Sequence, residues 1–360
     1  MTTDEHPLLG STPTPPMMGH QSKGALGLSL GVGLTNACDL ACAHCYRDTE
    51  RVDQLSLEQV VSACECLPVR SVNLGTGENG LHPDYAEIVR ALAARSVRLS
   101  LTSNGFTIDR SSDETLKAFR EVEVSIDFPT EAEQDGFRGR GNWKRVMAAI
   151  ERARGLGVTV TVLTVMMKTN FGRLPEIAKV AFAAGAHYRV NVYQPVKTDA
   201  FTLTYEEFWD GFRRLLAAAR LVSTTEPILN AMLGEPFKNG SGCGRQTVRI
   251  TPKGDIVPCV YWTKSDLRLE DLPTHGADGV LASPQFARVR QVPDVCRSCP
   301  FVSTCQGGCS GRRELAGGVE LADPYCPLVR GERVALEWAP AAARELLKTG
   351  SACTTVLGPA

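Results

Sequence analysis

The cysteines restrict the possible folds of this chain more than any other feature of its sequence. Ten of the thirteen fall into two sets, and the first set is Cys38, Cys42 and Cys45, spaced Cys-x3-Cys-x2-Cys. Three thiols so close in the chain can converge on one iron–sulfur cubane, which usually takes four ligands, so one iron would stay open to a small molecule. The alternatives are a structural zinc site that also uses His44, or three unrelated buried thiols.

This spacing resembles that of the radical S-adenosylmethionine (SAM) superfamily. The resemblance implies that Cys38, Cys42 and Cys45 hold a 4Fe–4S cluster whose fourth site is filled by the amino and carboxylate groups of SAM. It also implies that one-electron reduction cleaves SAM to a 5′-deoxyadenosyl radical. His44 and Tyr46, within and directly after the motif, are expected to line the SAM site.

The composition argues against several classes of function. Lys and Arg total 39 against 40 Asp and Glu in 360 residues, a formal net charge of −1, so neither nucleic acid nor an anionic membrane is an expected partner. No apolar run approaches the ~20 residues that a membrane helix needs, and the N-terminus is polar. We therefore expect a cytoplasmic protein whose clustered cysteines bind metal clusters and do not form disulfides.

From Leu26 onward, short apolar runs alternate with amphipathic stretches, a pattern that predicts βα units and a parallel sheet. The predicted fold class is α/β, a partial (βα)6 TIM-type barrel followed by a small Cys-rich β-hairpin and loop domain. In such barrels the ligand-binding loops follow the carboxyl ends of the strands, where the first cysteine set lies. The expected strands are Leu28–Leu34, Ser71–Leu74, Val97–Thr102, Val122–Asp127, Val158–Met166 and Tyr188–Tyr193. The expected helices are Ser56–Leu67, Pro83–Ala94, Asp113–Phe119, Asn142–Gly155 and Leu174–Ala184.

Two capping boxes are expected at helix starts, where a Ser or Thr side chain and a Glu three residues later satisfy free backbone N–H groups. These pairs are Ser111 with Glu114 and Thr204 with Glu207. A tight turn, Pro252–Asp255, between two apolar runs predicts a small β-hairpin over residues 247–260.

Polar and glycine residues follow three of the expected strands. Thr76-Gly77-Glu78 follows the second strand, and it matches the Gly-Gly-Glu loop that holds the SAM amino group in the superfamily, with one Gly replaced. Ser103 and Asn104 follow the third strand and could offer polar groups to the ribose, although Asn-Gly is first of all a turn signal.

The fourth strand carries the residues expected to bind the SAM carboxylate. In sulfatase-maturing and peptide-modifying relatives a Ser on this strand and an Arg about a dozen residues later bind that group, which implies Ser125 and Arg138 here. Arg140 is a rival for Arg138, because the usual His-Asp before the Arg appears as Gln134-Asp135.

The second cysteine set resembles the SPASM domain, an extension that carries two auxiliary 4Fe–4S clusters. The resemblance implies that Cys243, Cys259 and Cys309 hold the first auxiliary cluster and that the second is held by Cys296, Cys299, Cys305 and Cys326. A zinc ribbon is the alternative, but it leaves the first cysteine set unexplained.

A count of ligands leaves two vacancies among the three expected clusters. One vacancy belongs to SAM, and the other falls on the first auxiliary cluster, because residues 235–238 lack the upstream Cys of fuller relatives. That iron could bind substrate, water or another ligand, and a substrate Cys thiolate is one possibility. Cys64 and Cys66 are expected to be inert buried thiols, and Cys353 a residue of the C-terminal tail, with roles as hydrogen-atom donor or extra ligand left open.

These patterns divide the chain into five segments. They are a flexible leader over 1–25, a radical SAM partial barrel over 26–222, a linker over 223–239, a SPASM domain over 240–327, and over 328–360 a closing helix (328–347) with a tail.

The resemblance implies a SAM-dependent oxidoreductase that abstracts hydrogen from a substrate C–H bond. Its expected substrate is a ribosomally made peptide, and its product a thioether or carbon–carbon cross-link. Val260 replaces the Asp that follows the second ligand of the first auxiliary cluster in sulfatase-maturing relatives, which counts against that subtype.

Two other functions stay open from the sequence. One is a radical SAM dehydrogenase or epimerase of a sugar or amino acid, because about 25 residues before the first strand cannot form a leader-recognition domain. The other is a non-catalytic iron–sulfur electron carrier. Expected partners of the enzyme are a low-potential electron donor of the flavodoxin or ferredoxin type and a separate leader-peptide-binding protein.

Overall fold

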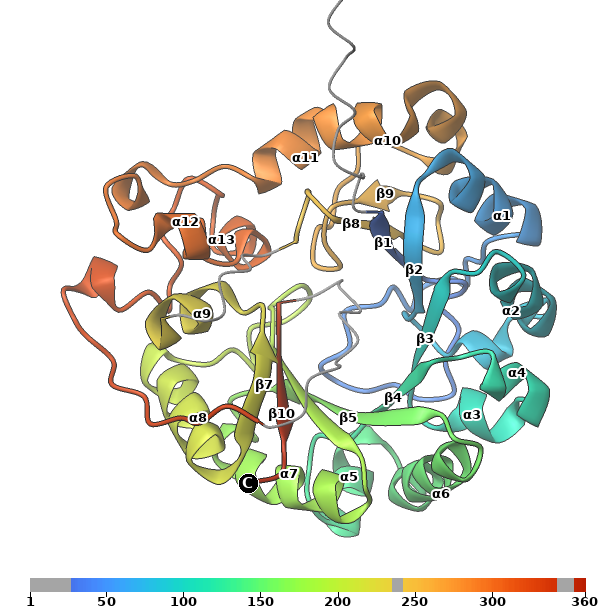
Figure 1. Cartoon of the computed structure of the whole chain (residues 1–360), viewed down its shortest axis with the longest axis horizontal. Coiled ribbons are helices and arrows are strands. Elements are labelled where there is room, and N and C mark those ends of the chain that lie inside the picture. Colours follow the sequence, from blue (N-terminus) through green and yellow to red (C-terminus); the bar gives the residue numbers. More distant parts are fainter. Residues whose placement is uncertain (1–26, 235–241, 342–352) are drawn as a thin grey trace, which may run out of the picture.

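The computed structural model describes residues 27–234, 242–341 and 353–360. The predicted leader over 1–25 lies outside these residues. One sheet of ten strands runs through the molecule in the order β7-β10-β6-β5-β4-β3-β2-β1-β8-β9. The sheet curves, and most of the helices that connect its strands lie on its outer side (Figure 1).

The six predicted strands are all formed, and each is parallel to the next. Their residues are largely buried, as is usual for parallel strands covered by helices. The strands are β1 (Leu28–Val32), β2 (Val69–Leu74), β3 (Arg98–Ser103), β4 (Glu121–Ser125), β5 (Thr159–Met166) and β6 (His187–Val192). This arrangement confirms the predicted α/β fold class.

The five predicted helices between these strands are formed as well. They are α1 (Leu57–Cys66), α2 (Tyr85–Ala93), α4 (Asp113–Lys117), α6 (Asn142–Gly155) and α7 (Leu174–Ala183). Two short helices were not expected, α3 (Phe106–Arg110) and α5 (Glu131–Arg138). Both directly follow the loops at the carboxyl ends of strands, so they help to shape the site described below.

One of the two predicted capping boxes is wrong by one residue. Ser112, not Ser111, caps α4 and accepts a hydrogen bond from Thr115 N at 3.1 Å. The Ser111 hydroxyl is engaged elsewhere, since it donates to Thr107 O at the end of α3 at 2.6 Å. The box of Thr204 with Glu207 is confirmed at the start of α8 (Tyr205–Ala218).

The Cys-rich region begins with the predicted hairpin, β8 (Thr247–Ile250) and β9 (Ile256–Val257). β8 pairs in parallel with β1, so the hairpin continues the barrel sheet and places this region beside the first cysteine loop. Helices follow that the sequence did not indicate: α10 (Leu272–Ala282), α11 (Pro284–Val289), α12 (Val302–Cys305) and α13 (Ser310–Leu315). Short 3₁₀ turns occur at Asn79–Leu81, Phe171–Arg173, Leu269–Asp271, Asp294–Cys296 and Leu328–Arg330.

The opposite edge of the sheet departs from the sequence expectations. Residues 223–239, expected to be a linker, begin inside β7 (Arg220–Thr224) and include α9 (Pro227–Leu233), while 235–239 lie outside the described residues. The last strand, β10 (Thr354–Gly358), is antiparallel and lies between β6 and β7. The end of the chain is therefore part of the central sheet.

The closing helix expected over 328–347 is wrong as far as the structure describes it. A 3₁₀ turn ends at Arg330, and Gly331 follows with a left-handed backbone (φ 73°), which is a common way to end a helical turn. Residues 332–341 are not helical, and 342–347 lie outside the described residues.

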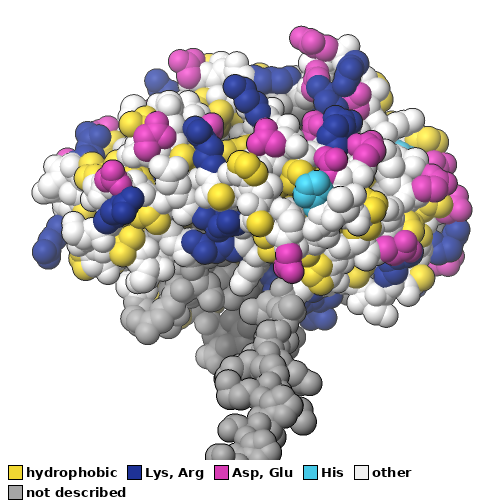
Figure 2. Space-filling model, turned by 90° about the horizontal axis from the view of Figure 1, so that it is seen from above, with side chains coloured by type: hydrophobic (Ala, Val, Ile, Leu, Met, Phe, Trp, Pro, Cys, Tyr) yellow, Lys and Arg dark blue, Asp and Glu magenta, His cyan; other side chains and the backbone are white. Residues whose placement is uncertain are grey.

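Two further properties bear on function. Within the described ranges no helix is long and apolar enough to cross a membrane. On the face shown in Figure 2, Lys and Arg side chains are interspersed with Asp and Glu, which agrees with the nearly neutral composition.

Candidate active site and cysteine clusters

The loop that follows β1 carries the first cysteine set, and its own hydrogen bonds fold it around one cavity. The Arg47 guanidinium donates to Asn36 O at 3.0 Å and to Leu40 O at 2.6 Å, which ties the two ends of the motif together. Cys38, Cys42 and Cys45 all line the resulting cavity. Three thiols from one loop thus face a common space, as ligands of one cluster must.

The loop after β2 is fastened to the cysteine loop by its backbone. Glu78 N donates to Ala37 O at 2.7 Å. A Cβ on Gly77 would lie 2.4 Å from Thr35 O and 2.6 Å from Ala37 O, and its φ of +64° also favours glycine. Only a glycine fits where the two loops meet.

Glu78 is buried at the floor of this cavity. Its carboxylate accepts hydrogen bonds from the Ser103 hydroxyl, from Asn104 N at 2.9 Å and from Thr107 N at 2.8 Å. Burial raises the pKa of Glu78, against the effect of these donors. The carboxylate therefore organises the turn from β3 into α3 and lines the cavity at the same time.

Asn104 joins that turn to the cysteine loop. Its side-chain amide donates to Asp39 Oδ1 at 2.7 Å and lies 3.6 Å from Cys38 Sγ. Ser103 and Asn104, both expected at the SAM site, thus line the same cavity as the thiols.

The end of β4 supplies a buried ion pair to the cavity wall. Arg138 donates to Asp127 Oδ2 from Nε at 2.8 Å and from Nη2 at 2.6 Å, and its Nη1 lies 4.0 Å from Cys42 Sγ. Burial acts to lower the pKa of Arg138, but the adjacent Asp127 carboxylate outweighs it, so the guanidinium stays charged. Ser125 and Arg138 both line the cavity, whereas Arg140 is exposed outside it.

Asp127 was missed by sequence reasoning, although it lies only two residues after Ser125, the last residue of β4. No role was predicted for Gln134, which stands in place of the His expected from sulfatase-maturing and peptide-modifying relatives. Its side-chain oxygen accepts from Asp127 N at 2.9 Å, and its amide donates to Ser125 O at 3.1 Å. Gln134 thus fixes the backbone of the strand end, so the departure from the family pattern keeps a positioning role.

His44 lies on the same side of the cavity. Its ring stacks on Phe137 with centroids 5.0 Å apart, and its Nε2 is 3.8 Å from Asp127 Oδ2. Burial lowers the pKa of His44 to about 4, against the opposing effect of Asp127, so the ring is neutral near pH 7. Its Nδ1 is buried without a hydrogen-bond partner.

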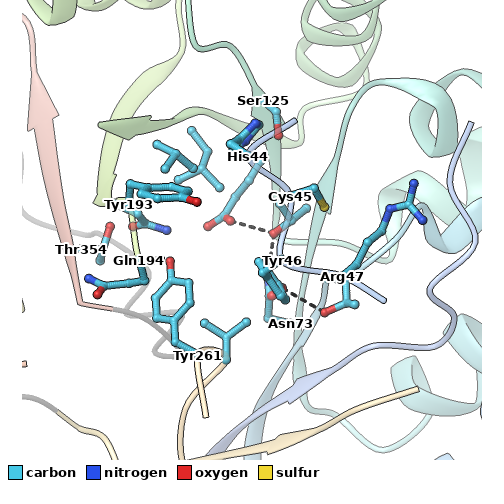
Figure 3. Close-up of a pocket in the computed structure, with 18 of the residues that line it drawn as sticks. His44, Cys45, Tyr46, Arg47, Asn73, Ser125, Tyr193, Gln194, Tyr261 and Thr354 are labelled. Carbon is cyan, nitrogen blue, oxygen red and sulfur yellow. Dashed lines mark hydrogen bonds between the residues drawn. The ribbon is translucent and has the colours of Figure 1, made fainter. Parts of the chain in front are cut away.

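A second cavity of about 210 Å³ opens directly beside the first, and the two share His44, Cys45, Thr76, Ser125 and Arg138 in their walls. Figure 3 shows His44 and Ser125 at one end of this second cavity and Tyr261 at the other. Tyr46 lines it as well, and packs edge-on against Tyr261 with ring centroids 6.0 Å apart. We refer to this space as the central cavity.

Polar groups of β6 and β8 line the central cavity. Arg249 on β8 donates to Thr76 Oγ1 at 3.1 Å, and Arg189 on β6 pairs with the Glu123 carboxylate. Asn191 Oδ1 and Gln194 Oε1 are buried without a hydrogen-bond partner. Such orphaned acceptors suit the N–H groups of a bound molecule, because leaving them unpaired costs free energy.

The second cysteine set divides into two groups in space. Cys296, Cys299, Cys305 and Cys326 line one small cavity with apolar residues of α9. Cys259 and Cys309 are buried on either side of Gly311, where a Cβ would lie 3.4 Å and 4.0 Å from their sulfurs, and the Cys243 thiol is hydrogen-bonded to Cys259.

Cys353 belongs with this last group. Its thiol is hydrogen-bonded to the thiols of Cys243 and Cys309. No local pattern places Cys353 in this group, because it lies 44 residues after Cys309. By contrast, Cys64 and Cys66 lie on α1, outside both groups.

The donor sets fit iron–sulfur clusters in their chemistry, since thiolates are the usual ligands of such clusters. No three Cys, His, Asp or Glu side chains within residues 27–234, 242–341 and 353–360 are arranged to hold a single metal ion.

Comparison with family models identifies two regions of the chain. Residues 32–181 match the model of the radical SAM superfamily, and residues 242–300 match SPASM, described as an iron–sulfur cluster-binding domain. The first match contains the loop with Cys38 and the cavity residues from β2 to β4. The second contains the β8–β9 hairpin and Cys243, Cys259, Cys296 and Cys299.

Two groups of curated relatives resemble most of the chain. The mycofactocin maturase MftC of Mycobacterium ulcerans (strain Agy99) is 28% identical over 318 residues, which cover 81% of this chain and 86% of that protein. The PqqA peptide cyclase of Methylocella silvestris is 26% identical over 337 residues, which cover 82% of this chain and 86% of that protein.

Solved structures share the fold at lower sequence identity. Streptococcus suis SuiB bound to its precursor peptide SuiA aligns with a TM-score of 0.62 and 17% identity, covering 83% of this chain and 75% of SuiB. anSMEcpe with bound AdoMet aligns with a TM-score of 0.67 and 17% identity, covering 84% of this chain and 94% of anSMEcpe. These likenesses support the fold described above.

Proposed function

We propose that this chain, a radical SAM enzyme with a C-terminal SPASM domain, modifies a ribosomally made peptide by forming an oxidative thioether or carbon–carbon cross-link. The observation that carries the proposal is the central cavity. It shares a wall with the cavity of Cys38, Cys42 and Cys45, and it reaches Val260 and Tyr261, directly after Cys259. A peptide side chain held there lies between the site of radical formation and a second cluster.

In this proposal three clusters are bound. The SAM-binding cluster is held by Cys38, Cys42 and Cys45. The first auxiliary cluster is held in part by Cys243, Cys259 and Cys309. The second auxiliary cluster is held by Cys296, Cys299, Cys305 and Cys326. The clusters and SAM together supply the one-electron reduction that makes the hydrogen-abstracting radical. The protein's part is to bind, orient and exclude water.

Charged residues of the cavity bind the oppositely charged groups of SAM. The Arg138 guanidinium is the cation for the SAM carboxylate, and Asp127 keeps it in place. Ser125, at the end of β4, binds the same carboxylate. Glu78 is the anion for the SAM ammonium, and Thr76 and Gly77 let that group approach the backbone. Ser103 and Asn104 face the ribose, while His44 and Tyr46 pack against the ligand.

The substrate is held by the polar wall of the central cavity. The orphaned oxygens of Asn191 and Gln194 accept hydrogen bonds from peptide N–H groups, since both are buried and unpaired. One hydrogen atom leaves the peptide for the radical, and a proton and an electron leave as the new bond forms. The peptide therefore loses two hydrogens, and an auxiliary cluster, when bound, would supply an acceptor for the electron.

The similarity to a peptide cyclase and a maturase over most of the chain supports a peptide substrate. The electron that starts the reaction comes from an external low-potential flavodoxin or ferredoxin, and a separate leader-binding protein delivers the peptide. Both partners are part of the proposal.

The test is an anaerobic assay of the reconstituted, reduced protein with SAM and the short peptide encoded beside its gene. We expect 5′-deoxyadenosine and a peptide lighter by two hydrogens. Failure to form 5′-deoxyadenosine would leave an electron carrier as the function. A peptide of unchanged mass that carries a D-residue would indicate epimerisation, and an unmodified peptide would favour a small-molecule substrate.

A further inference from the structure

Cys353 lies beside Cys243, Cys259 and Cys309. From the sequence, these three cysteines are expected to hold the first auxiliary cluster and to leave one of its irons without a cysteine ligand. We propose that Cys353 is the fourth cysteine ligand of the first auxiliary cluster, with Cys243, Cys259 and Cys309. The inference rests on the proposed cluster content, but not on the identity of the substrate. It replaces the expectation of an open iron with that of a cluster closed by the end of the chain.

The contacts among the four thiols carry the inference. The Cys353 thiol is hydrogen-bonded to the thiols of both Cys243 and Cys309, and the Cys243 thiol is hydrogen-bonded to Cys259. Every one of the four sulfurs is therefore linked to another of the group. Four cysteines gathered in one place make up the full ligand number of a cubane.

The backbone at Cys353 is held by the central sheet. Cys353 directly precedes β10, where Thr354 N donates to Thr225 Oγ1 at 3.1 Å and Thr354 O accepts from Thr225 N at 2.8 Å. Thr354 also pairs with Asn191 of β6 in the strand register. A residue placed by two strands is a fixed ligand and not a chance contact of a loose tail.

The side chains of Cys353 and Thr354 serve different sides of the strand. Thr354 lines the central cavity, beside Gln194 in Figure 3, whereas Cys353 is not among the residues of that wall. The Cys353 thiol instead contacts the thiols of Cys243 and Cys309. This orientation argues against Cys353 as the hydrogen-atom donor to a substrate in the cavity.

The surroundings of the thiols suit a buried cluster. An apolar group of Val257, Trp262, Val289 and Val319 packs around Cys259, with Cys243 and Tyr261 at its border.

The proposal changes the role of the first auxiliary cluster. With four cysteines its irons are all occupied, and a substrate thiolate has no site to bind. The cluster would then supply an acceptor for the substrate electron. Tyr261, two residues after Cys259, packs against Tyr46, which directly follows Cys45. The ligand count also closes, because eleven thiols and SAM fill the twelve sites of three cubanes.

The test uses the full chain with Cys38, Cys42 and Cys45 all changed to Ala, so that only auxiliary clusters contribute signals. In this parent we expect about eight irons and no binding of ¹³C-cyanide to the reduced clusters in electron–nuclear double resonance spectra. Adding Cys353→Ala should open one iron and produce a ¹³C coupling, or release that iron and leave about seven. Cys353→Ser should keep the iron but shift the midpoint potential of one cluster.

Cys64→Ala in the same parent is the matched control and should leave iron content and spectra unchanged. A ¹³C coupling in the parent itself would overturn the proposal, and so would a Cys353→Ala protein indistinguishable from the parent. The parent measurement needs no Cys353 variant, so it decides even if that variant fails to fold. No peptide is present, and a failure of the peptide assay is therefore a separate result.

Discussion

The two sets of cysteines nearest the central cavity are assembled in opposite ways. Cys38, Cys42 and Cys45 come from one loop of eight residues, which is tied together by Arg47 and by the adjoining β2 loop. Cys243, Cys259, Cys309 and Cys353 come from four separate segments that span 110 residues. The first group is a local motif that needs only its loop, whereas the second depends on the curvature of the sheet, because β8 and β10 lie near its opposite edges.

This contrast has a consequence for stability. A cluster on one short loop joins residues that are already close in the unfolded chain, and closing a short loop restricts that chain little. A cluster on Cys243 and Cys353 joins distant residues and restricts it more. The SAM-binding cluster is therefore expected to contribute to catalysis alone. The first auxiliary cluster is expected to contribute both to electron transfer and to the stability of the fold.

The largest expected effect is on catalysis. Changing Cys38, Cys42 and Cys45 together to Ala should abolish formation of 5′-deoxyadenosine, while the unfolding temperature stays within a few degrees and about eight irons remain. Product analysis, iron content and a thermal melt check this. Loss of all iron would contradict the claim that the SAM-binding cluster and the auxiliary clusters are held by separate sets of cysteines.

Removing iron from the whole protein should instead act on stability. If the auxiliary cluster links segments 110 residues apart, its loss should cost about 5 kcal/mol of unfolding free energy, by analogy with a disulfide across a loop of that length. Hydrogen exchange after anaerobic chelation should rise in β10 and β8 more than in β3 and β4. Equal increases in the hydrogen-exchange rate of all four strands would contradict the expected difference between the two sets of cysteines.

The ion pair of Arg138 and Asp127 tests the local site. Arg138→Met leaves Asp127 buried without its partner, so we expect a loss of about 3 kcal/mol in stability. The Kd for SAM should also rise at least about tenfold, because a charge-assisted hydrogen bond is lost. Arg140→Met is the matched control, with both quantities unchanged. An equal weakening of SAM binding in the two variants would remove Arg138 from the site.

The smallest effect is expected at α1. Cys64→Ala and Cys66→Ala should each change the unfolding free energy by less than about 1 kcal/mol and leave iron content as it is, since both thiols are only half-buried and neither lines a cavity with the other cysteines. A chemical denaturation curve and an iron assay are sufficient. Loss of an iron–sulfur cluster signal in either variant would mean that the changed cysteine of α1 is itself a cluster ligand.

The sequence predicted what depends on local pattern. Alternating apolar runs predicted β1 to β6 and the β8–β9 hairpin, because each strand is buried on both faces or follows a tight turn. The polar residues after those strands were brought to one cavity by the parallel sheet alone, which is why Ser125, Glu78 and Arg138 meet there. Their contacts with SAM stay predictions.

What the sequence could not supply depends on long-range pairing. β10 is antiparallel between two strands that lie more than 130 residues before it, and no local signal encodes that partner choice. The position of Cys353 follows from this pairing. Asp127 and Arg249 were missed for a similar reason, since a lone charged residue becomes informative only when its buried neighbour is known.

The most direct test of the account follows a deuterium atom from the peptide. The neighbouring peptide, deuterated on its side chains, is incubated with reconstituted enzyme, SAM and a low-potential reductant. The account predicts one deuterium in each 5′-deoxyadenosine formed, and a cross-linked peptide that has lost that deuterium and one further hydrogen isotope. Unlabelled 5′-deoxyadenosine, formed at the same rate with or without peptide, would contradict the claim that the central cavity places a peptide C–H bond before the radical.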